Sequence, residues 1–93
     1  MKNFFTTVLL VITIPVFAQT NDSAQYYFNK GKEQKDAKLY SQASKSFEKA
    51  IALNPQFTDA YIQSGYVNIA MYKNSQAINN FSKAKELDPS NTT

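Results

Sequence analysis

The sequence repeats itself with a period of 34 residues, and this limits its fold more than any local feature. A shift by 34 positions superposes the two halves without a gap. The identical pairs are Tyr27 and Tyr61, Gly31 and Gly65, Ser41 and Ser75, Gln42 and Gln76, Ala43 and Ala77, Phe47 and Phe81, Lys49 and Lys83, Ala50 and Ala84, Leu53 and Leu87, and Pro55 and Pro89. This period is that of a helix–turn–helix solenoid unit. It predicts an all-α fold, an α-solenoid of two stacked antiparallel helix hairpins, and such solenoids mostly build binding surfaces.

Proline and short polar segments set the expected helix boundaries. We expect helices over residues 24–37, 41–53, 58–71 and 75–87. Asn54-Pro55 and Asp88-Pro89 end the second and fourth helices, because proline cannot continue the hydrogen-bond ladder. Asp22 with Ser23, and Ser41 and Ser75 in turn, are residue types that cap the helix that follows. The connections within each pair are short, so the partner helices are antiparallel.

The repeated residues have packing roles that their sizes suggest. Glycine inside a helix costs about 1 kcal/mol relative to alanine, which predicts that another backbone passes close to Gly31 and Gly65. Small alanines on the returning helices, at Ala43 and its copy Ala77, are the expected partners. The other repeat-packing positions fill the space on either side or receive the next unit, and they are Tyr27, Phe47, Ala50, Pro55, Tyr61, Phe81, Ala84 and Pro89.

With these positions assigned, residues 24–89 resemble the tetratricopeptide repeat family. The first unit reads Tyr27-x-x-Lys30-Gly31 and continues with Ala43, Phe47, Ala50 and Pro55, and the second unit carries the same series 34 residues later. Lys30 and Ser64 replace a leucine-like residue of the family, and Gln34 and Asn68 replace an aromatic one, which predicts a leaner core. We divide the chain into repeat 1 (24–57) and repeat 2 (58–91), preceded by a polar lead (19–23) and followed by a tail (92–93).

The resemblance implies a right-handed superhelix whose first helices line a concave inner face that docks proteins or peptides. The implied inner-face residues are Gln25, Phe28, Lys32, Lys35, Asp59, Ile62, Tyr66 and Ile69. A carboxylate-binding clamp known in the family is not carried over, because Phe28 and Ile62 stand where it needs polar groups and the chain has no Arg. Phe28, Lys32, Lys35, Ile62, Tyr66 and Ile69 are the partner-binding candidates. The apolar stripe among them either docks a peptide or packs against a neighbouring helix or chain.

The first eighteen residues have the order of a secretory signal peptide. Met1-Lys2-Asn3 supplies a positive start, residues 4–17 form an uncharged apolar run, and Val16-Phe17-Ala18 suits cleavage after Ala18. As a helix this run spans only about 21 Å, short of the roughly 30 Å hydrocarbon core of a membrane. The expected product is exported, periplasmic or secreted, with no stable membrane insertion after cleavage; an uncleaved anchor is the alternative.

Composition argues against catalysis and nucleic-acid binding. The chain has no His or Cys, the usual bases, nucleophiles and soft metal ligands, and no glycine-rich loop, so we expect no enzyme, cofactor or metal. The net charge of +3 is mild, and all the positive side chains are lysines, which read neither guanine nor phosphate bidentately.

Two repeats leave one end of a solenoid open. Arrays generally need about three units to bury their faces, so the fourth helix is expected to expose Ile78 or parts of Ala84 and Leu87. Three explanations stay open: a fragment of a longer array, self-association into a homo-oligomer, or a partner protein that supplies the missing helix. The expected function is a scaffold for protein or peptide partners; the alternative is a self-associating structural module with no ligand of its own.

Overall fold

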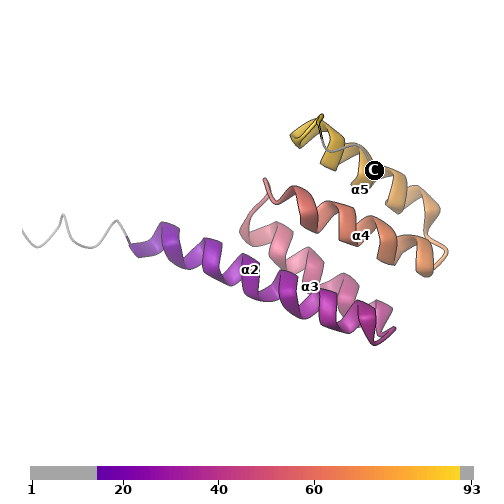
Figure 1. Cartoon of the computed structure of the whole chain (residues 1–93), viewed down its shortest axis with the longest axis horizontal. Helices are drawn as coiled ribbons and strands as arrows, with labels where there is room; N and C mark the ends of the chain where they lie inside the picture. The colour runs from indigo at the N-terminus through magenta and orange to yellow at the C-terminus, as the bar shows by residue number, and fades with distance from the viewer. Residues whose placement is uncertain (1–14, 91–93) are drawn as a thin grey trace, which may run out of the picture.

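The computed structural model describes residues 15–90, with side chains from residue 22 onward. Four helices make up these residues: α2 (Pro15–Asp36), α3 (Tyr40–Leu53), α4 (Thr58–Ala70) and α5 (Asn74–Leu87). α2 pairs with α3 and α4 pairs with α5 as two antiparallel hairpins, and α4 lies between α3 and α5 in the stack (Figure 1). The all-helical fold of two hairpins is confirmed. The predicted signal peptide up to residue 14 and the 92–93 tail lie outside the described residues.

The start of the first hairpin differs from the prediction. α2 begins at Pro15 and continues through Asp22 and Ser23, so neither residue caps a helix and residues 19–23 are helical rather than an extended lead. The reason is local: no glycine or proline interrupts residues 16–30, and proline itself fits the first turn, where its missing N–H has no partner to lose. The expectation that Pro15 holds an extended segment is therefore wrong.

The predicted serine caps of α3 and α5 are also wrong. The residues that precede these helices are Leu39 and Lys73, and neither makes a side-chain capping hydrogen bond. Each turn is instead built by one residue in the left-handed region, Lys38 with φ 63° and Tyr72 with φ 62°. This conformation reverses the chain in three residues, so the next helix starts one residue earlier than predicted.

The far ends of the hairpins follow the predicted rule. Asn54 and Asp88 leave the helical conformation immediately before a proline, and their N–H groups donate to the carbonyls of Ala50 and Ala84. Each side chain then accepts a hydrogen bond from the backbone N–H two residues later, at 3.1 Å and 3.3 Å. The Asn-Pro and Asp-Pro pairs thus end α3 and α5 in the same way.

The core lies where the first hairpin meets α4. Its buried members are Phe28, Ala43, Phe47, Ala50, Ala60 and Val67, with Tyr27, Tyr40, Ile51, Phe57 and Met71 packed against them. Phe47 and Val67 are the largest fully buried side chains among the described residues. The second hairpin is leaner, because Phe81 is only half-buried where its counterpart Phe47 is fully buried.

The glycines approach an aromatic ring, not the alanines. A Cβ atom added at Gly31 would lie 2.6 Å from the Phe47 ring, and one added at Gly65 would lie 2.6 Å from the Phe81 ring. The predicted close contact with Ala43 and Ala77 is therefore wrong in its partner. The physical reason is that a phenyl ring laid flat against a bare backbone fills the helix interface better than two small side chains.

Polar residues at the expected aromatic positions join the helices of each hairpin. Ser46 donates to Gln34 at 2.6 Å, and Asn80 donates to Asn68 at 2.7 Å. The two pairs occupy equivalent places, because each partner shifts by 34 residues. A buried amide is stable only when it is hydrogen-bonded, and no buried side-chain polar atom among the described residues lacks a partner.

Candidate functional site

The predicted inner face lies where α2 and α4 run side by side. Lys35 joins the two helices: its Nζ donates to Oε1 of Gln63 at 2.6 Å and lies 5.7 Å from the centroid of the Tyr66 ring. Lys32, one turn earlier, is exposed and places its Nζ 5.1 Å over the Phe28 ring. Both lysine stems cover aromatic surface while the ammonium groups meet solvent. The result is a positively charged edge beside an aromatic surface.

The apolar stripe on α4 is partly open. Tyr66 is 44% exposed and Ile69 is 50% exposed, whereas Ile62 is half-buried. The Tyr66 ring meets the Phe81 ring edge to face, with centroids 5.3 Å apart and planes at 68°, so Tyr66 has a fixed position. The three residues follow one another at helical spacing and form one continuous surface. We call them the α4 stripe.

Phe28 does not belong to this surface. It is only 7% exposed, and its ring packs at 4.8 Å from Phe57 and 5.8 Å from Phe47, centroid to centroid. Its place as a partner-binding candidate is corrected by this burial: α4 and the loop before it cover the side chain. The same covering explains why only its lysine neighbours on α2 reach solvent.

A polar cleft that the sequence reasoning missed opens between α3 and α5, with α4 as its floor. Its volume is about 310 Å³, and it is lined by Glu48, Ile51, Tyr61, Ser64, Asn68, Gln76, Asn79 and Asn80. Asn68 and Asn80 connect its walls, and Asn68 also donates to Gln76 at 3.4 Å. The signal that could have revealed it was the 34-residue spacing of Gln34 with Asn68 and of Ser46 with Asn80.

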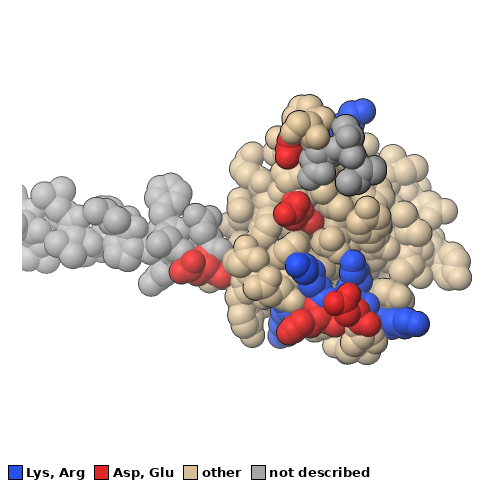
Figure 2. Space-filling model, viewed as in Figure 1, with Lys and Arg blue, Asp and Glu red and all other residues tan. Residues whose placement is uncertain are grey.

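The charges are unevenly spread over the molecule. Figure 2 shows Lys, Asp and Glu side chains gathered over α2 and α3, while the surface over α4 is largely uncharged in that view. Within residues 15–90, no three His, Cys, Asp or Glu side chains come together as metal ligands would. Of the helices described, none has the length and apolarity to cross a bilayer.

Comparison with known proteins establishes the family. The tetratricopeptide repeat family matches residues 24–57 and 58–91. The small glutamine-rich tetratricopeptide repeat-containing protein 2 of Saccharomyces cerevisiae is 30% identical over 71 residues, which are 76% of this chain and 20% of that protein. The UDP-N-acetylglucosamine–peptide N-acetylglucosaminyltransferase of Giardia intestinalis is 34% identical over 65 residues, 70% of this chain and 4% of the enzyme.

This chain belongs to the tetratricopeptide repeat family. Repeats of this family generally mediate protein–protein interactions and are typically non-catalytic. The chain spans about one fifth of the yeast relative and a far smaller share of the Giardia enzyme. The match to the enzyme therefore transfers no activity to this chain.

Proposed function

We propose that the chain is an exported, non-enzymatic scaffold that binds protein or peptide partners through the α4 stripe. The observation that carries the proposal is the stripe itself: Tyr66 and Ile69 are large apolar side chains about half exposed, beside Lys32 and the bridged Lys35. Contiguous exposed apolar surface rimmed by polar groups is typical of a protein-interaction site. The family's general role supports the same function.

Cross-linking of the full chain in an envelope or secreted fraction tests the binding role. A photo-reactive residue is placed at Asp59, an exposed position on the same helix, and the products are identified by mass spectrometry. Tyr66→Lys and Ile62→Lys should abolish a specific product. Leu39→Lys is the matched control, because Leu39 is comparably exposed and lysine already occupies the equivalent position 73. Products that are unchanged in the stripe variants count against the proposal.

Export is the second part of the proposal. It is supported by the order of a charged start, an apolar run and Val16-Phe17-Ala18 in the sequence. The mature chain is proposed to begin at Gln19 in the periplasm or outside the cell. Intact mass measurement of the exported species tests this, and an uncleaved chain that stays in the membrane fraction would refute it.

Self-association is the second candidate, because Ile78 on α5 is 65% exposed. Isolated large apolar side chains are common on surfaces, but this one lies next to the half-buried Phe81 on the outer helix of the stack. Light scattering coupled to size exclusion separates the candidates. A monomer at micromolar concentration excludes self-assembly, and a dimer that Ile78→Lys dissociates favours it.

A further inference from the structure

The first hairpin shows how this fold receives a helix. α4 packs against it in the core: Ala60 and Val67 of α4 join Ala50 of α3 in one buried cluster. Phe57, just before α4, stacks on Phe28, and Gln63 accepts the hydrogen bond from Lys35. The face formed by α2 and α3 is therefore a seat for one helix, and α4 occupies it.

The second hairpin carries an equivalent seat. Because the repeat has no gap, each residue of the occupied seat has a counterpart 34 positions later. We call these counterparts the end seat: Ile62 for Phe28, Ile69 for Lys35, Ile78 for Ser44, Phe81 for Phe47 and Ala84 for Ala50.

The end seat is apolar and uncovered by any described residue. Ile69 is 50% exposed and Ile78 is 65% exposed, and Phe81 is half-buried where Phe47 is fully buried. α5 forms the end of the stack away from α2 and α3 (Figure 1). A face with this much apolar surface is a place for a helix to pack, as the first hairpin shows.

We infer that the partner segment is an amphipathic helix that occupies the end seat in the register in which α4 occupies the first seat. This inference rests on the protein-binding function proposed above, and it identifies the partner's chemistry. In that register the partner presents a small residue where α4 has Ala60 and an apolar one where α4 has Val67. These two positions face the hairpin, as they do in the occupied seat.

Two differences between the seats specify the partner further. Ile51, which lines one cleft with Tyr61, is replaced by Lys85 in the end seat, so an acidic residue at the partner's Tyr61 position faces a lysine. Lys35, which bonds to Gln63, is replaced by Ile69, so an apolar residue fits at the Gln63 position. The partner helix therefore reads small, acidic, any residue and apolar in succession, with a further apolar residue at the position of Val67.

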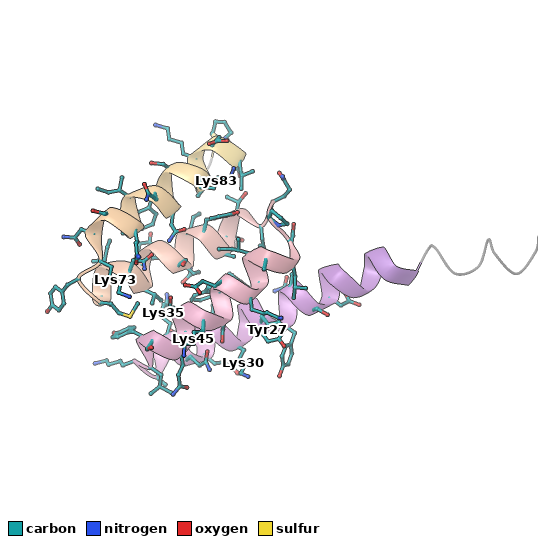
Figure 3. The ribbon with its side chains drawn as sticks, turned by 180° about the vertical axis from the view of Figure 1, so that it is seen from behind. Tyr27, Lys30, Lys35, Lys45, Lys73 and Lys83 are labelled. Carbon is teal, nitrogen blue, oxygen red and sulfur yellow. The ribbon has the colours of Figure 1, made fainter. Side chains whose placement is uncertain are left out.

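The charges around the end seat support an acidic partner. Lys73 and Lys83 lie toward opposite ends of α5 (Figure 3), and Lys85 adds a third positive side chain to the same helix and its start. Lys83 pairs with Glu86 at 3.5 Å, which leaves Lys73 and Lys85 to meet acidic groups of a partner. Complementary charge of this kind selects and orients a partner.

A second copy of the chain does not fit the seat head to tail. The outer face of α2 would have to take the place of α4, but it presents Tyr26 where α4 has Ala60 and Glu33 where α4 has Val67. Tyr26 is 59% exposed and is too large for the alanine position, and Glu33 would place an unpaired carboxylate in an apolar contact. The occupant is therefore a different helix.

A peptide made from α4 itself provides the probe. It comprises residues 56–72 with blocked ends, a fluorophore, and the changes Tyr61→Glu and Gln63→Leu; a control peptide carries Tyr61→Lys with the same Gln63→Leu. Anisotropy with the full chain at low salt should show saturable binding that is about fivefold tighter for the glutamate peptide, since one charge pair at the rim changes from attraction to repulsion. Lys85→Glu in the chain should reverse this preference.

Two chain variants locate the binding. Ile78→Lys should weaken the glutamate peptide at least tenfold, whereas the control Leu39→Lys should leave it unchanged. Absence of binding, or binding indifferent to both Ile78→Lys and Lys85→Glu, overturns the inference. So does a dimer of the chain that Ile78→Lys dissociates, since a second copy is then the occupant. If cross-linking still depends on the α4 stripe while the peptide fails, the proposed function stands and only the helical register is wrong.

Discussion

Alanine at the two repeated glycines should have unequal effects, although the local sequences are alike. At both positions the new Cβ would lie 2.6 Å from a phenyl carbon, closer than packed atoms tolerate, so the ring must move. The rings differ in freedom. Phe47 is fully buried within the core cluster, whereas Phe81 is half-buried at the open end of the stack.

The magnitudes follow from two opposed effects. Alanine gains about 1 kcal/mol over glycine in a helix, and overpacking a closed core costs about 1–3 kcal/mol. At Gly31 the enclosed ring of Phe47 puts the cost near the upper end, and Gly31→Ala should destabilise the fold by about 2 kcal/mol. At Gly65 the ring of Phe81 can rotate outward, so the two effects nearly cancel and Gly65→Ala should change stability by less than about 0.5 kcal/mol.

Thermal unfolding followed by circular dichroism measures the difference. For a domain of this size, 1 kcal/mol shifts Tm by about 4–8 °C, so Gly31→Ala should lower Tm by about 8–16 °C and Gly65→Ala by little. Equal losses at both glycines, or a stabilised Gly31→Ala, would refute the reasoning. A double-mutant cycle identifies the cause: in a Phe47→Leu background the ring is gone, and Gly31→Ala should become neutral or stabilising.

Three further substitutions test the packing. Phe28→Ala should destabilise the fold by about 3 kcal/mol in urea unfolding, because it leaves a cavity in the core. Asn80→Ala should cost about 1–3 kcal/mol by the same assay, because the buried amide of Asn68 loses its 2.7 Å donor; the double change of Asn68 and Asn80 to leucine should recover most of this loss. Ile69→Lys should leave stability within about 0.5 kcal/mol, because its side chain is half exposed and Lys35 occupies the equivalent place; a larger loss would show that Ile69 already packs within the fold.

The sequence predicted the helices well because the repeat and the prolines are local, redundant signals. Four helices, their pairing and the two Pro-terminated ends follow from features visible in the letters. The turns were misjudged by one residue, because Lys38 and Tyr72 adopt the left-handed conformation that glycine or asparagine usually signals. Neither residue type announces such a turn, and only its repetition 34 positions later marks it in retrospect.

The partner of the glycines could not be read from spacing. Gly31 and Ala43 are both small, and small residues at a helix interface suggest that backbones approach each other. A ring against a bare helix satisfies the same spacing. The choice between the two depends on how the hairpin is rotated about its axis, and residue size leaves that rotation undetermined.

The candidate surface was predicted only in part, because burial depends on the neighbouring repeat. Tyr66 and Ile69 were placed correctly on an exposed face, but Phe28, at the position equivalent to Ile62, is covered by the helix that follows. The repeat therefore makes equivalent residues chemically similar and structurally different, according to whether another helix follows. The same logic gives the two interpretations of the α4 stripe a common meaning. A stripe that docks a partner and a stripe that packs against a neighbouring helix are one surface, and the first hairpin shows which kind of helix that surface accepts.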